Sequence, residues 1–142
     1  MPRAAPLMRV TGEGQLRAAL AAAVAAAPEA IASAGLIEME MVMAEAKGET
    51  PIDFGVLRDS GNVMPPDISP TSVEISAGFG GAASAYALVQ HENLSLSHSV
   101  GGPKYLERPF LARTPAMTAA MAASLRAALS RLATECRAGR AG

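Results

Sequence analysis

The feature that most constrains the fold is a helical pattern at each end of the chain with one short β-like stretch between them. Near the C-terminus, apolar side chains recur every three or four residues, the spacing of one face of an α-helix: Met117, Met121, Leu125, Leu129, Leu132 and Cys136. An alanine-rich helical pattern begins at Glu13. This order predicts an α+β domain, in which a small antiparallel sheet packs against a long N-terminal helix and a C-terminal helix.

The N-terminal helix is expected to be kinked near Pro28. Proline suits the first turn of a helix, so a kink or a restart is expected there. Gly48 is a plausible C-cap. Before the proline, the apolar side chains form a narrow stripe padded with alanine: Leu16, Leu20 and Val24, continued by Ile31.

The middle of the chain carries the strand signals. Residues 62–64 are expected to be extended, and 65–67 to form a loop because they contain two prolines. Residues 72–79 alternate apolar with polar or small side chains, the period-two pattern of a half-buried strand. Residues 86–92 are expected to form another strand or an irregular extended segment. Helical structure is expected to resume at 103–111, with Pro115 opening the final helix.

Length and composition fit one domain. At 142 residues the chain can form a single modest core, and assembly with other subunits would help to bury its surface. We expect a flexible arm at 1–12, one α+β domain at 13–137 and a flexible tail at 138–142. The single cysteine, Cys136, cannot form an internal disulfide and is expected to be buried.

A membrane role is not expected from the sequence. The first residues lack the apolar core of a signal peptide. The apolar run at 18–27 is short and alanine-rich, and a proline follows it. We therefore expect a soluble protein.

Charge is segregated along the chain, although the net charge is only −1. Residues 29–74 carry nine acidic and two basic side chains, whereas 103–142 carry seven basic and two acidic ones. This distribution suits complementary packing, within one chain or between copies, but two solvated faces are an equal alternative.

Three constellations suggest chemistry, and each has a plainer interpretation. His91 and His98 could ligate a metal, but they fall in a loop without supporting ligands. Ser60, His91 and Asp59 could form a hydrolase triad, but no Gly-x-Ser-x-Gly elbow is present. The C-terminal arginines could contact nucleic acid, but alanines rather than aromatic residues separate them. No enzyme activity and no cofactor are expected.

Four segments, taken together, resemble one protein family. Residues 50–61 contain Pro51, Asp53, Gly55, Leu57 and Arg58 in the order of a signature of neck or tail-completion proteins of long-tailed bacteriophages. The family's next features are a strand, similar to 73–78, a Tyr-Ala-x-x-x-His-Glu motif, similar to 86–92, and an aromatic-Leu-Glu helix start, similar to 105–110. Phe54 departs from the pattern, because the family commonly has threonine there.

The resemblance implies a virion structural protein of the head–tail junction, assembled in the host cytoplasm. Such proteins form homo-oligomeric rings, usually sixfold, between the head-closure or connector proteins and the tail-tube or tail-terminator proteins. DNA would be a partner only as it passes through the ring. The residues that the resemblance marks as structural or interface candidates are Pro51, Asp53, Gly55, Leu57, Arg58, Tyr86, His91, Glu92, Tyr105 and Leu106. The alternative hypothesis is a small nucleic-acid-binding module that uses the basic C-terminal helix.

Overall fold

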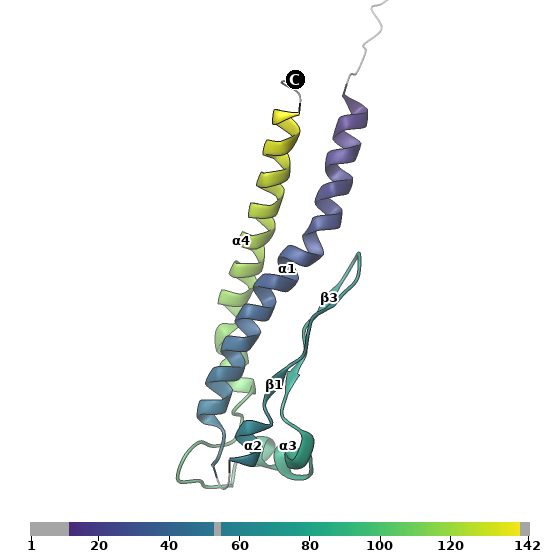
Figure 1. The fold of residues 1–142 in the computed structure, drawn as a ribbon. Helices are drawn as coiled ribbons and strands as arrows, with labels where there is room; N and C mark the ends of the chain where they lie inside the picture. The colour runs from purple at the N-terminus through teal and green to yellow at the C-terminus, as the bar shows by residue number, and fades with distance from the viewer. Residues whose placement is uncertain (1–11, 53–54, 140–142) are drawn as a thin grey trace, which may run out of the picture.

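Two long helices and a thin β-ribbon make up the molecule (Figure 1). The computed structural model describes residues 12–52 and 55–139. Helix α1 (Glu13–Glu49) runs antiparallel to α4 (Glu107–Ala138), and the two helices splay apart toward the N-terminus of α1. The shorter helical elements gather at the opposite end: α2 (Val56–Asp59), η1 (Gly81–Ala83) and α3 (Ser84–Glu92).

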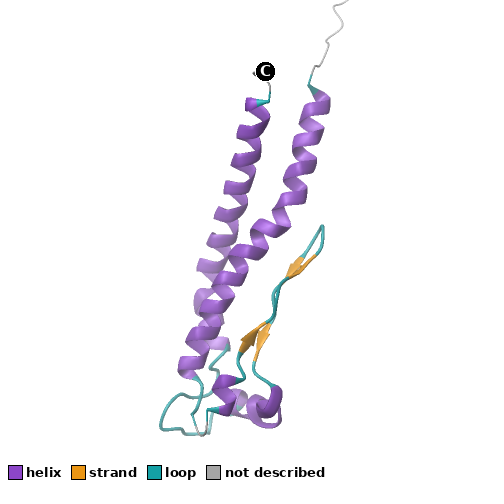
Figure 2. Ribbon diagram, in the orientation of Figure 1, coloured by secondary structure: helices purple, strands orange, loops and turns teal. Residues whose placement is uncertain are grey.

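The β-ribbon is one long hairpin with two ladders (Figure 2). Near its base β1 (Asn62–Val63) pairs with β4 (Ala77–Gly78), and near its tip β2 (Asp67–Ile68) pairs with β3 (Val73–Glu74). Both pairings are antiparallel. The prediction of an α+β fold with a small antiparallel sheet against two helices is therefore confirmed. The single strand expected at 72–79 is two short strands instead, and the loop expected at 65–67 ends in β2.

Helix α1 continues without interruption through Pro28. A proline ring removes one backbone N–H and crowds the carbonyl four residues earlier, so a bend is expected there, and the axis of α1 changes direction in this region (Figure 1). The alternative of a restart at Pro28 is wrong.

The C-terminal end of α1 lies one residue later than expected. Gly48 is not the C-cap, because the helix extends to Glu49. Thr50 ends it with a ψ of 133°, the extended conformation favoured before a proline.

The main core lies where α1, the base of the hairpin and α4 meet. Its buried side chains are Met39, Val42 and Met43 of α1, Val63 of β1 and Met117 of α4. Gly35 admits this arrangement, because a Cβ there would collide with the Met121 side chain and lie 2.6 Å from Ile75 Cδ1.

The distal ends of both helices lie outside this core. Leu16, Leu20 and Val24 are each more than half exposed, so the described part of the chain does not cover the narrow apolar stripe that they form. Cys136 is also exposed, contrary to expectation, because α4 has diverged from α1 at that level. Pro115 lies inside α4 rather than at its start.

The continuity of α1 also bears on the expectation that the chain has no membrane role. By length and composition α1 is apolar enough to cross a bilayer, since Pro28 does not divide it. Core helices and signal sequences meet the same criterion, so this is weak support for a membrane role.

The loop after α3 packs against the end of α1. Gly101 has a left-handed φ of 75°, and Gly102 N–H donates to Glu49 O over 3.1 Å. A Cβ on Gly101 would lie 2.7 Å from Thr50 C and 2.8 Å from Pro51 N, which are backbone atoms. This loop therefore depends on a residue without a side chain.

We predict that Gly101→Ala destabilises the fold by about 2–4 kcal/mol, since it adds a steric clash with backbone to an unfavourable φ. Gly81→Ala is the matched control: Gly81 also has a positive φ, 60°, but no atom lies near its Cβ position. Urea unfolding followed by circular dichroism measures both. Equal losses for the two variants would contradict the proposed clash.

Candidate functional site

The segment at 50–61 forms the corner between α1 and the hairpin. Pro51 and Leu57 are buried, and Gly55, with a φ of 78°, precedes α2 in a conformation that suits glycine. Arg58 is exposed, with its Nε 3.8 Å from Asp59 Oδ1. Asp53 lies outside the described residues. The corner therefore supplies two buried residues, Pro51 and Leu57, and a backbone geometry that depends on proline and glycine.

Residues 86–92 form part of helix α3, so the expected strand is wrong. The reason is a four-residue repeat: Ala83 and Ala87 are buried and His91 is half-buried, on one helical face. Leu88 and Val89 are exposed, which period-two burial in a strand would not produce. Tyr86 is 38% exposed.

Tyr105 is the centre on which several predicted site residues converge. Its side chain is 1% exposed and packs in a second cluster with Leu57, Ala83 and Ala87, bordered by Phe79 and Leu106. Its hydroxyl donates a 2.8 Å hydrogen bond to Ala87 O. The rings of Phe79 and His91 each meet it edge-to-face, at centroid distances of 5.0 and 4.9 Å.

Four polar side chains form a compact ionic group beside Tyr105. The Lys104 ammonium lies between two carboxylates, 2.7 Å from Glu107 Oε2 and in contact with Glu92. His91 Nδ1 lies 2.6 Å from Glu92 Oε1, and His91 Nε2 accepts the backbone N–H of Glu107 over 3.3 Å. We call His91, Glu92, Lys104 and Glu107 the polar cluster.

Electrostatics within the polar cluster favours the charged forms. Hydrogen bonding to Lys104, followed by that to His91, lowers the pKa of the Glu92 carboxyl. Hydrogen bonds to Glu107 and Glu92 raise the pKa of the Lys104 ammonium. Lys104 is the one described non-glycine residue with positive φ, at 60°. Its backbone N–H donates a 2.7 Å hydrogen bond to the carbonyl of His91, so the backbone conformation of Lys104 depends on the end of α3.

His91, Glu92 and Glu107 present ligand atoms within 4.8 Å of one another, a spacing that a divalent metal could use. The metal pair considered from sequence, His91 with His98, is not this group. The Lys104 ammonium already bridges the two carboxylates, and His91 Nε2 already accepts a backbone hydrogen bond. A metal would have to displace both the Lys104 ammonium and the backbone N–H of Glu107, so the donor set as arranged fits an ion-pair cluster better than a metal site.

The hydrolase triad considered from sequence is not assembled in the described structure. Ser60 Oγ donates to Leu57 O over 2.7 Å and accepts the N–H of Gly80 over 3.3 Å. His91 pairs with Glu92 instead. Both side chains stabilise turns and helix ends rather than forming a nucleophile and its base.

A second ionic group joins the two long helices. Arg113 of α4 lies 2.9 Å from Glu45 and 3.5 Å from Glu38 of α1, and its side chain is 21% exposed. Sequence analysis did not single out Arg113, Lys104, Glu107 or Phe79. The opposite charges of the two chain halves indicated such pairing in general, but the particular pairs depend on how the helices are aligned.

Burial raises the pKa of the Tyr105 hydroxyl to about 12, from an ordinary value of 10.0, and the nearby Tyr86 adds to this. The folded state therefore retains a proton that the unfolded chain releases, so stability is lost as pH rises through this window. We predict a slope of about 1.4 kcal/mol per pH unit between these values. Denaturant titrations of the wild type and of Tyr105→Phe measure it. The Lys104 ammonium, whose pKa is also raised, adds its own slope in this window, so Tyr105→Phe is expected to have a shallower slope than the wild type and the Tyr86→Phe control. Equal slopes in all three proteins would refute this assignment.

Comparison with known proteins identifies no relative. No protein-family model matches the chain, and neither a curated protein nor a solved structure does. The function must therefore be argued from the residues and their geometry.

Proposed function

We propose that the protein is a structural subunit of the head–tail junction of a long-tailed bacteriophage, in which identical copies assemble into a ring that joins the capsid connector to the tail. One observation carries this proposal. Residues of three of the four segments that resemble the neck and tail-completion family meet around Tyr105, together with Phe79, which directly follows the other segment, although they are far apart in the sequence. Leu57 comes from the corner, His91 lies in the last turn of α3, and Leu106 precedes α4.

This convergence suits a structural role for the shared residues. The hydroxyl of Tyr105 donates a hydrogen bond to a helix carbonyl, and Lys104 pairs with both carboxylates of the polar cluster. Groups that bind one another in this way hold α3, the loop before α4 and the start of α4 in one arrangement. Side chains that maintain a family's fold are expected to bond to one another in this way rather than to a ligand.

The uncovered surface of a single copy supports assembly. Leu16, Leu20 and Val24 are exposed in a row along α1, and Leu111 is 61% exposed on α4. Contiguous apolar surface of this kind marks protein–protein contact sites. Cyclic rings of identical subunits cover such surfaces with one repeated interface.

We predict that the purified protein forms closed oligomers, with six copies as the expected number from the resemblance, and that antibodies to it label the neck of virions. Native mass spectrometry gives the mass, and electron microscopy of labelled particles gives the position. A protein that stays monomeric at high concentration and is absent from particles would contradict the proposal.

A nucleic-acid-binding module is the second candidate, and one observation favours it. Arg126, Arg131 and Arg137 are exposed on α4 and form no ion pair within the described residues. Arg108 and Arg113 are less available, because they face carboxylates of α1.

For this candidate we expect duplex DNA affinity to fall with salt, with a log–log slope of about −2 to −3 for three phosphate contacts. Fluorescence anisotropy measures the slope for the wild type and for a triple alanine variant of these arginines. Absence of binding at low salt removes the candidate; binding that the triple variant retains shows that α4 is not the contact surface.

A further inference from the structure

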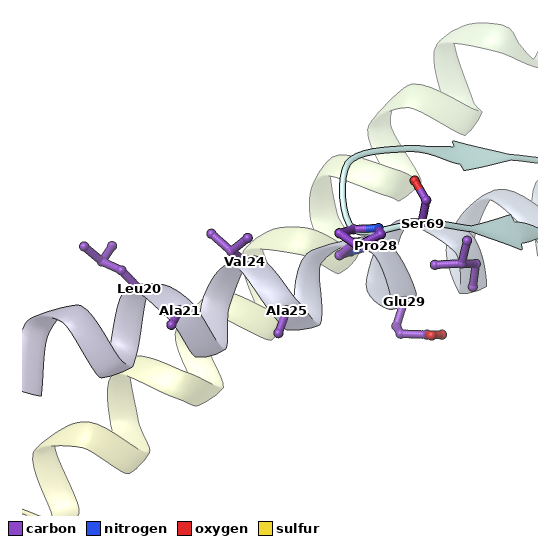
Figure 3. Close-up of a pocket in the computed structure, with 9 residues that line it drawn as sticks. Leu20, Ala21, Val24, Ala25, Pro28, Glu29 and Ser69 are labelled. Carbon is purple, nitrogen blue, oxygen red and sulfur yellow. The ribbon is translucent and has the colours of Figure 1, made fainter.

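An apolar groove lies between the N-terminal half of α1 and the tip of the hairpin (Figure 3). Its volume is about 650 Å³. Leu20 and Val24 project from the same side of α1, with exposed fractions of 57% and 65%. The groove is lined by Leu20, Ala21, Val24, Ala25, Pro28 and Glu29 of α1 together with Ile68, Ser69 and Pro70 of the hairpin.

Three acidic side chains without a basic partner in the described residues lie on the two elements that form this groove, and Glu29 is the one that lines it. Glu29 lines it and is exposed. Asp67 and Glu74 lie directly opposite each other in the β2–β3 ladder, and both are exposed. Like charges in that position are destabilising unless a cation neutralises them. No ion pair forms at these three residues among the part of the chain that the structure describes.

The distal half of α4 carries exposed apolar and basic side chains, which complement an apolar groove near acidic residues. Leu129 is 41% exposed there, and Arg126, Arg131 and Arg137 are exposed without ionic partners in the described residues. The bases nearer the start of α4 are already paired: Lys104 with Glu92 and Glu107, Arg108 with Glu49, and Arg113 with Glu38 and Glu45. Unpaired acids and unpaired bases are thus separated on two surfaces of one molecule.

The two surfaces lie at the same height along the helices. Ser124 Oγ of α4 donates to Ala30 O of α1 over 2.8 Å, which aligns these two positions. Because the helices are antiparallel and rise equally per residue, Leu129 is level with Ala25, and Arg126 with Pro28. Within one copy the distal half of α4 is well separated from the tip of the hairpin (Figure 1).

We propose that the groove receives the distal half of α4, residues 122–137, from a second copy of this chain. Leu129 of the incoming helix would lie against Leu20 and Val24, and Arg126, which shares its helical face three residues earlier, would lie near Glu29. The contact joins two different surfaces at equal height, so repeated copies related by rotation about an axis parallel to the helices can close into a ring without an axial step. This inference rests on the proposed assembly of identical copies and names its interface.

Substitutions at exposed positions test the interface without disturbing the core. Val24→Asp in the groove and Leu129→Glu on α4 are expected to reduce the oligomer to monomers in native mass spectrometry. Leu88→Asp is the matched control, since Leu88 is 70% exposed on α3, away from the groove, and should leave the mass unchanged. Circular dichroism verifies that each variant keeps its helix content.

Disulfide trapping tests the register directly. In a Cys136→Ser background, a Val24→Cys chain mixed with a Leu129→Cys chain is expected to form a mixed disulfide dimer under mild oxidation. A Leu88→Cys chain mixed with the same partner should not. Cross-linking requires collision at these surfaces and therefore does not depend on a stable ring.

The outcomes separate this interface from the proposed function. An oligomer that Val24→Asp and Leu129→Glu leave intact, with no mixed disulfide, overturns the interface while the assembly stands. A wild-type protein that remains monomeric, together with Val24→Cys and Leu129→Cys chains that form no mixed disulfide, overturns both. Loss of the oligomer in both variants together with the mixed disulfide supports the interface.

Discussion

The contact of α1 with α4 and the hairpin, at Gly35 and the turns that follow it, determines the rest of the structure. The ends of the Met121 and Ile75 side chains occupy the space that a side chain at Gly35 would fill, so the glycine lets all three elements pack closely here. Met39, Val42 and Met43 extend the contact toward the corner, where Met117 and Val63 complete it. Methionine adapts to irregular surfaces, which suits a core built from two helices and a ribbon without a wide sheet.

Two regions of opposite electrostatic character follow from this contact. Toward the corner, Arg113, Lys104 and Arg108 all face carboxylates. Toward the splayed ends, the acids of the hairpin and Glu29 lie apart from the arginines of α4, and apolar side chains are uncovered. The charges near the corner are thus paired within the chain, whereas the splayed helix ends have the composition of a contact surface.

The sequence predicted the α+β class, the two terminal helices and the bend near Pro28 because those properties follow from local periodicity and from the proline ring. It also singled out Leu57, His91, Tyr105 and Leu106, which the fold brings together. It misassigned 86–92, because a short segment with mixed side chains carries no strong period and the helix is selected by packing Ala87 and His91 against Tyr105. Lys104 could not be found, since its positive φ and its two carboxylate partners exist only after α3 and α4 are in place.

The distribution of charge separates most clearly what the sequence determined from what the tertiary structure decided. The sequence by itself determined that acids concentrate in 29–74 and bases in 103–142, and that both helices have an apolar side. Only the tertiary structure decided which charges pair within the chain and which apolar side chains are buried. The physical reason is alignment: Ser124 lies beside Ala30, which brings Arg113 to Glu38 and Glu45, while the divergence of the helices beyond that point leaves Leu20, Val24 and the distal arginines in solvent.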